Sequence, residues 1–236
     1  MLVVGFDTAT DDTAVCARRG GEVLFERALG RDERAGRPRH ATALLPAVDA
    51  AVRDCGGWEA VDLIAAGVGP GSFTGLRIGI ATARALSAAL GVPAVGAGTL
   101  DALAEGLRER AAGRPVLALT DARRGELFAR LHGAGEGPFG QPTLVGPEAL
   151  LDAVGGLGEI PLAAGSGALR FRAELAGRGV EIPDDDDPAH RVAARHTCAL
   201  GAAAADAGAG PPEPIYLRPP DAERWRERDN PSKSDR

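Results

Sequence analysis

Residues 67–93 read GVGPGSFTGLRIGIATARALSAALGVP, and this stretch decides the fold class. A Gly/Pro turn follows an apolar run, and small residues then recur at every fourth position, at Gly71, Gly75, Gly79 and Ala83. On an α-helix, positions four apart lie on one side, where a missing side chain lets another backbone come close. The stretch therefore predicts a strand, a tight turn and a closely packed helix.

The other faces of this helix are almost entirely apolar. They carry large side chains at Leu76, Ile78, Ile80, Leu86 and Leu90, and their only charged residues are Arg77 and Arg84. A helix that is apolar almost all round is buried on two sides. We expect one side to lie on the chain's own sheet and the other to receive a partner.

Apolar runs separated by turn residues extend this pattern in both directions. Strands are predicted over residues 2–6, 13–17, 23–29, 61–68, 94–97, 116–120 and 127–131. Helices are predicted around 44–52, beginning just before Pro46 or kinked there, and over 75–90, 100–111, 147–154, 168–176 and 191–207. Three strands, a helix and a strand open the chain, and a similar order begins again after residue 113. This repetition indicates an α/β protein with two lobes of related design, the second shortened.

Charge and composition limit the classes of function. The chain has 33 acidic and 27 basic residues among 236, a formal net charge of -6, and Lys233 is the only lysine. A free-standing nucleic-acid-binding protein usually carries a net positive field, which this chain lacks. Local arginine clusters, such as Arg123 and Arg124, remain possible RNA contacts.

The cysteines and the chain ends indicate a soluble, cytoplasmic protein. Cys16, Cys55 and Cys198 are scattered and odd in number, so they form neither a disulfide framework nor a CxxC metal site. The N-terminal apolar run is short and lacks a basic region, and it is interpreted as a first strand rather than a signal peptide. No segment is long enough to cross a bilayer. Residues 219–236 are predicted to form a disordered tail.

Two sequence features each allow two interpretations. The GPGSFTG segment at residues 69–75 resembles a phosphate cradle before a helix, but it lacks the GKS or GKT ending of a P-loop, and its spacing favours a tight strand-to-helix turn. Asp7 ends the first predicted strand, where it can orient a metal–phosphate group or cap a β-turn. The weak candidates for phosphate binding are therefore Asp7, Gly69, Gly71 and Ser72.

No catalytic or metal-binding set is evident. The four histidines, His40, His132, His190 and His196, are never paired four residues apart, and we expect surface or capping roles for them. Neither Ser72 nor Ser166 lies in a GxSxG elbow, so a serine hydrolase triad is not predicted.

Four segments in order carry a resemblance to a known family: GFDTATDDT at residues 5–13, the long glycine stretch, DARRGELFA at 121–129 and PIYLRPP at 214–220. The chain resembles the TsaB (YeaZ-like, glycoprotease-like) proteins of bacterial tRNA threonylcarbamoyladenosine (t6A) biosynthesis. This resemblance implies a two-lobed actin/sugar-kinase/Hsp70-like (ASKHA) fold, with one lobe over residues 1–103 and a reduced lobe over 104–218. It also implies a scaffold and activator role toward a catalytic paralogue, TsaD, together with an ATPase, TsaE.

Comparison with that paralogue suggests that the chain is non-catalytic. TsaD proteins carry an NHxEGH-like segment with two metal-binding histidines, where this chain reads AGTLDAL at residues 97–103. Thr99 and Leu103 take the histidine positions, and Asp101 takes the acidic one. Leucine does not ligate metals and a Thr/Asp pair is a poor divalent site, so neither a metal nor another cofactor is expected.

The resemblance also suggests how partners bind. Helices near residues 40–53 and 75–90 would pack on equivalent helices of the paralogue, or of a second copy when the chain is alone, and tRNA would be met only through the complex. The expected interface residues are Leu44, Val48, Gly75, Leu76, Gly79, Ile80 and Ala83. The alternatives are a nucleotide-binding ASKHA-type enzyme and a glycoprotease-like hydrolase.

Overall fold

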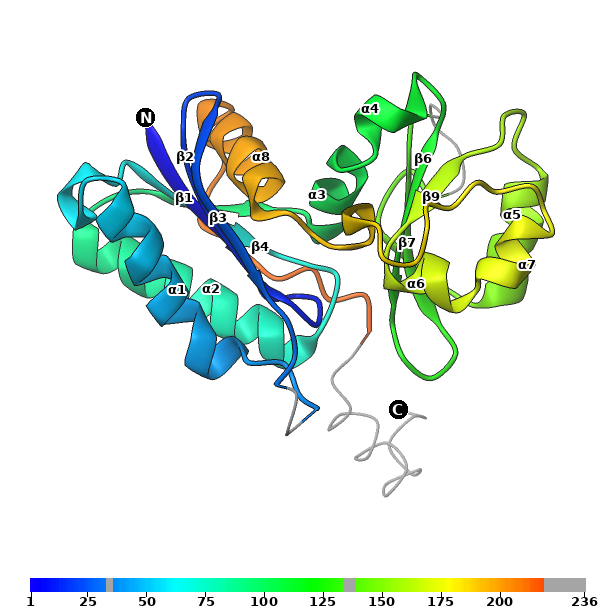
Figure 1. Ribbon diagram of the computed structural model, residues 1–236, viewed down its shortest axis with the longest axis horizontal. Helices are drawn as coiled ribbons and strands as arrows, with labels where there is room; N and C mark the ends of the chain where they lie inside the picture. Colours follow the sequence, from blue (N-terminus) through cyan, green and yellow to red (C-terminus); the bar gives the residue numbers. More distant parts are fainter. Residues whose placement is uncertain (33–35, 134–138, 219–236) are drawn as a thin grey trace, which may run out of the picture.

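A computed structural model describes residues 1–32, 36–133 and 139–218, which form two lobes lying side by side (Figure 1). The first lobe is built on a five-stranded sheet in the order β3-β2-β1-β4-β5. Its strands are β1 (Leu2–Asp7), β2 (Thr13–Arg19), β3 (Glu22–Leu29), β4 (Leu63–Gly67) and β5 (Ala94–Ala97). All five strands predicted for this half of the sequence are confirmed. The predicted tail, residues 219–236, lies outside the described residues.

The central strand β1 decides the sheet's mixed topology. It pairs antiparallel with β2, with Val4 opposite Ala17, and parallel with β4, with Val4 opposite Ile64. Parallel neighbours need a crossover, which helix α1 (His40–Asp54) and the 3-10 helix η1 (Trp58–Ala60) supply. Helix α1 begins six residues before Pro46, so the proline lies inside the helix and not at its start.

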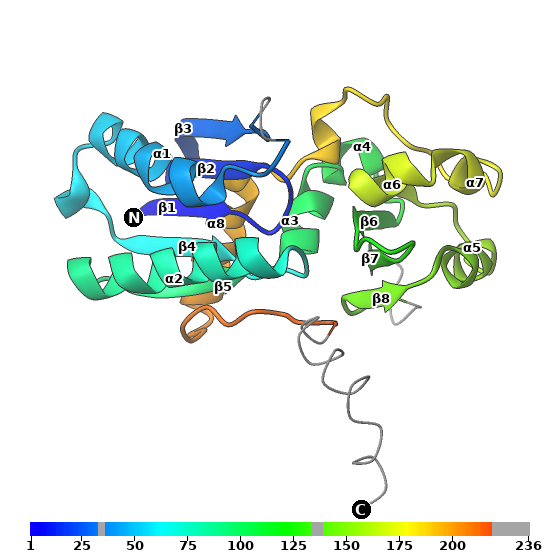
Figure 2. The same ribbon diagram turned by 90° about the horizontal axis from the view of Figure 1, so that it is seen from below.

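Helices cover both faces of this sheet. Helices α1 and α2 (Phe73–Leu90) lie next to each other on one face, and α8 (Ala194–Asp206) lies on the other (Figures 1 and 2). The Ser72 side chain accepts a hydrogen bond from Gly75 N at 3.2 Å and caps the start of α2, which ends at Gly91 in the left-handed region. The sheet is therefore buried on both sides, as its continuous apolar strands require.

The second lobe repeats the first in reduced form. Its sheet has the order β8-β7-β6-β9, in which β6 pairs antiparallel with β7 and parallel with β9, as β1 does with β2 and β4. These strands are β6 (Val116–Asp121), β7 (Leu127–His132), β8 (Thr143–Val145) and β9 (Leu162–Ala164). Helices α5 (Pro147–Gly155), α6 (Ser166–Arg170) and α7 (Arg172–Ala176) and the 3-10 helix η2 (Pro188–His190) complete this half. In the described residues nothing corresponds to β5, so the predicted shortened repeat is present.

The chain passes between the lobes just before helix α3 (Thr99–Glu105) and again before helix α8, which differs from the expected single division at residue 103. Helix α3 packs with Val116 and Leu162 in the core of the second lobe, followed by the short α4 (Arg108–Ala111). Helix α8 instead returns to the first sheet, where Cys198 packs with Val3. The first lobe therefore includes the C-terminal helix, and the chain passes between the lobes twice. The single helices expected over 100–111 and 168–176 are each broken into two.

The last described segment also joins the two lobes. Ile215 N donates to Val68 O at 2.8 Å, and Arg84 donates to Pro212 O at 2.8 Å, which holds the segment on the first lobe. Arg218 then reaches the turn between β6 and β7, donating to Ala122 O at 2.8 Å and pairing with Glu126. Within the described residues, none of the helices has the length and apolar character to span a bilayer.

Candidate functional site

The carboxylate of Asp7 caps a turn. Asp7 is buried, and its Oδ1 accepts a hydrogen bond from Ala9 N at 2.7 Å, two residues on. Its Oδ2 accepts from Thr99 Oγ1 at 2.7 Å. Burial raises the pKa of Asp7, and the two hydrogen bonds oppose that shift because they stabilise the ionised form. Of the two readings of Asp7, this geometry matches the β-turn cap.

Two backbone amides of the glycine turn before α2 donate hydrogen bonds to acceptors within the protein. Gly69 N donates to Thr99 Oγ1 at 3.1 Å, and Ser72 N donates to Ala9 O at 2.7 Å. A Cβ added at Gly71 would overlap that same carbonyl of Ala9. The β1–β2 turn therefore packs directly against the glycine turn, and Gly71 serves this close backbone packing. The arrangement favours a tight strand-to-helix turn over a phosphate cradle.

The positions that align with metal-binding histidines are part of the chain's own structure. Thr99 joins Asp7 to the glycine turn, and Leu103 is 1% exposed in the core of the second lobe. Asp101 pairs with Arg130 at 2.6 Å and lies 3.4 Å from His132 Nε2. No group of three or more His, Cys, Asp or Glu side chains that could hold a metal occurs in the described residues. This donor set does not fit a divalent metal.

The histidines are more buried than the sequence suggested. His190 Nδ1 accepts from Gly165 N at 3.1 Å while Nε2 lies 3.1 Å from Pro183 O, so the ring links two loops. His40 is also buried, with Nδ1 2.9 Å from Thr13 Oγ1. Burial lowers the pKa of His40, His132 and His196. His40 and His190 are therefore interior linking groups rather than surface residues.

Comparison with known proteins assigns the family. The uncharacterized protein Rv3421c of Mycobacterium tuberculosis is 36% identical over 225 residues, which are 93% of each chain. The protein TsaB of Escherichia coli, named for tRNA threonylcarbamoyladenosine biosynthesis, is 34% identical over 129 residues, 54% of this chain and 53% of its own. A solved Pseudomonas aeruginosa protein, described as similar to the peptidase YEAZ, is 27% identical with a TM-score of 0.74, covering 92% of this chain and 99% of its own.

The chain belongs to the TsaB/YeaZ-like family. A family profile described as TsaD, tRNA N6-adenosine threonylcarbamoyltransferase, also matches residues 33–138. The ROK hexokinase of Thermus thermophilus has the same fold class at 18% identity, with a TM-score of 0.50 over 87% of this chain and 100% of its own. The predicted ASKHA-like α/β fold is thereby confirmed.

In this TsaB/YeaZ-like chain, the residues expected to face a partner lie in the core. All seven are buried: Leu44, Val48, Gly75, Leu76, Gly79, Ile80 and Ala83. A Cβ added at Gly75 would overlap the carbonyl oxygen of Thr8, and one at Gly79 would lie 2.5 Å from Thr8 Oγ1. The glycine side of α2 therefore receives the β1–β2 turn of the same chain, and the expectation that these side chains contact a partner is wrong.

A different set of residues forms the exposed side of α1 and α2, here called the outer face. It comprises Leu45, Pro46, Ala81, Ala85 and Ala88, which are exposed, and the half-buried Ile78. Leu45 is 54% exposed although its neighbour Leu44 is buried. The exposed Arg77 and Arg84 flank these alanines on α2. The small and apolar side chains between them permit close helix packing. Sequence periodicity placed Gly75, Gly79 and Ala83 on one side of α2 correctly, but it assigned that side to a partner and did not single out the exposed alanines.

Proposed function

We propose that the chain is a non-catalytic scaffold and activator subunit of the t6A modification machinery, acting on a TsaD-like catalytic paralogue. The observation that carries this proposal is the role of the residues that replace the two metal-binding histidines of TsaD proteins. Thr99 supports a turn and Leu103 fills a core, so the fold is kept without metal donors at that place. A cytoplasmic location follows, because the tRNA substrate of the complex is modified there.

The outer face supplies the surface for assembly in this proposal. It lies on two helices of the first lobe, both within residues 33–138, which match the TsaD profile. Apolar area removed from water contributes about 25 cal/mol per Å². In this proposal the same face also pairs with a second copy of the chain when the paralogue is absent.

Reconstitution with the TsaD-like paralogue and a TsaE-like ATPase tests the role. We expect threonylcarbamoyl transfer to tRNA only when the chain and the paralogue are both present. The isolated chain is expected to transfer nothing and to retain no stoichiometric zinc or iron in metal analysis. Transfer by the chain alone, or about one tightly held ion per chain, would refute the non-catalytic role.

Leu45→Asp tests the docking surface. A charge placed in the middle of a desolvated patch is expected to weaken binding to the paralogue about 30-fold, as for an interface hot spot. Ile160→Asp is the matched control, because Ile160 is 50% exposed and lies in the second lobe away from α1 and α2. Both variants should melt like the wild type. Equal binding by the two variants would exclude the outer face as the docking surface.

A further inference from the structure

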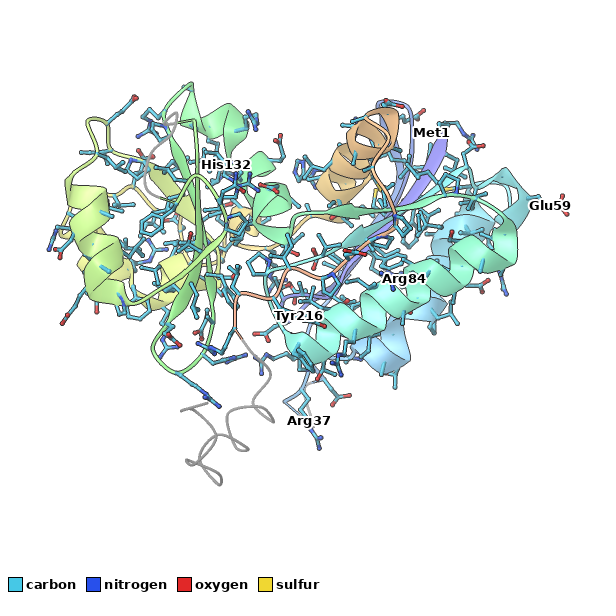
Figure 3. All side chains as sticks on the ribbon, turned by 180° about the vertical axis from the view of Figure 1, so that it is seen from behind. Met1, Arg37, Glu59, Arg84, His132 and Tyr216 are labelled. Carbon is cyan, nitrogen blue, oxygen red and sulfur yellow. The ribbon has the colours of Figure 1, made fainter. Side chains whose placement is uncertain are left out.

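One edge of the molecule collects arginines from both lobes. Figure 1 shows along its lower side the β1–β2 turn, the segment entering α1, the first residues of α2 and the β6–β7 turn. In Figure 3, Arg37 and Tyr216 lie toward this side, whereas Met1 and His132 lie toward the opposite side. We call the following six residues the arginine rim: Arg31, Arg37, Arg39, Arg123, Arg124 and Arg218.

Ion pairs join the rim across the lobes. Arg31 and Arg123, which come from different lobes, share the carboxylate of Asp11 at 2.6 and 3.2 Å. Arg123 also lies 3.9 Å from Asp121, and Arg218 pairs with Glu126 beside the same β6–β7 turn. Arg170 also pairs with Asp121 at 2.7 Å, so three guanidinium groups share the two carboxylates of Asp11 and Asp121 near the point where the lobes meet.

The rim keeps a positive excess after its neighbours are counted. The acidic residues in the described segments that carry the rim are Asp11, Asp12, Asp32, Asp121 and Glu126, fewer than its six arginines. Arg37 and Arg39 have exposed side chains with no ion-pair partner in the part of the chain that the structure describes. Helices α1 and α2, of 15 and 18 residues, both begin at this edge, and neither has an acidic residue in its first turn. Their dipoles therefore add to the positive field.

An aromatic stack stands beside the rim. The rings of Phe73 and Tyr216 are 5.2 Å apart, and the Arg77 guanidinium lies 3.8 Å from the centre of the Phe73 ring. Tyr216 is 42% exposed and is the only tyrosine of the chain. Tyr216 lies two residues before Arg218 in the chain, so the stack lies next to the rim. Exposed aromatic and guanidinium planes next to positive charge are the groups on which unpaired bases stack.

We propose that this edge is an RNA-contact surface, in which the rim binds backbone phosphates and the Tyr216–Phe73–Arg77 stack receives an unpaired base. The inference rests on the proposed function, since it gives this subunit a share in binding the tRNA. An acidic protein would bind through the arginine charges alone and would not use the aromatic stack. The exposed stack therefore favours single-stranded RNA as the partner. The net charge of -6 keeps the affinity of the isolated chain low, so the surface acts within the assembled complex.

The charge part is tested by Arg37→Gln with Arg39→Gln in the complex with the TsaD-like paralogue, using its tRNA substrate as the probe. Binding is measured across a salt series. Loss of two phosphate contacts should lower affinity on the order of tenfold at low salt and flatten the log–log salt slope by about one to two. The matched control is Arg53→Gln with Arg108→Gln, whose side chains are 75% and 65% exposed at other places in the fold. The control should leave affinity and slope unchanged.

The stacking part is tested by Tyr216→Ala. This variant should lose on the order of tenfold in affinity at every salt concentration, with the slope unchanged, because base stacking carries no counterion release. Tyr216→Phe keeps the ring and should bind like the wild type.

Wild-type RNA affinity and slope in the arginine variant would overturn the proposal, and so would weakened binding to the paralogue without weakened binding to RNA. Assembly is measured in the same samples, so failure of the proposed function is seen separately. If the chain does not assemble, the variants are compared on the isolated chain at low salt, where unchanged RNA binding also overturns the surface.

Discussion

Gly79→Ala directly tests the assignment of the glycine side of α2 to the core. The added Cβ would lie 2.5 Å from Thr8 Oγ1, far inside ordinary van der Waals contact. Thr8 has little freedom to move, because it is buried and its hydroxyl donates to Gly75 O at 2.7 Å. The next nearest atom, Thr8 Cβ, would lie at 3.8 Å, an ordinary contact. The clash therefore depends on a single oxygen atom.

The magnitude follows from two opposing effects. Replacing Gly by Ala inside a helix stabilises it by about 1 kcal/mol. Overpacking a core costs about 1–3 kcal/mol, and displacing the Thr8 hydroxyl adds the loss of a buried hydrogen bond, about 1 kcal/mol. We expect Gly79→Ala to lower the free energy of unfolding by about 1–3 kcal/mol. In the Thr8→Ala background, where the clashing oxygen is gone, the same change should be neutral or stabilising.

Urea unfolding of the four proteins in this cycle measures the coupling between residues 8 and 79. Ala85→Gly, on the exposed side of α2, is the control for helix propensity and should cost about 1 kcal/mol. If Gly79 faced a partner, Gly79→Ala would stabilise the isolated chain and would show no coupling to Thr8. That outcome would refute the packing argument.

Three further predictions concern the site and its charges. Thr99→Val removes the hydroxyl that donates to Asp7 and accepts from Gly69 N. Urea unfolding should show a free energy of unfolding lower by about 1–3 kcal/mol, whereas the control Thr74→Val, at an exposed position, should change it little. Burial lowers the pKa of His40 below its ordinary value of 6.5. The stability that the neutral ring contributes is therefore complete above pH 6.5 and falls as the pH drops through the pKa of the folded state. Between about pH 7.5 and 5 the wild type should lose stability relative to His40→Asn, and parallel pH curves would contradict this. The isolated chain, with a net charge of -6, should bind tRNA more weakly than about micromolar in a salt-titrated mobility shift, and submicromolar affinity would count against this prediction.

The sequence alone determined the elements and the family. Apolar runs bounded by turn residues and the four-residue spacing of Gly75, Gly79 and Ala83 are local signals, and they predicted most strands and the long helix α2. Short segments escaped this reasoning: β8 and β9 have three residues each, too few to show a period. The replacement of histidines by Thr99 and Leu103 was equally visible, because residue type alone decides whether a side chain can ligate a metal.

Only the tertiary structure decided what each surface meets. Periodicity groups residues on a face but does not say whether a sheet, a turn of the same chain or a partner covers it. The glycines of α2 receive Thr8, 67 residues before Gly75, and Asp7 finds Thr99 across 92 residues. Helix α8 likewise returns to a sheet formed at the start of the chain. Contacts of such separation depend on how all the intervening elements pack together, and no local pattern in the sequence records that arrangement.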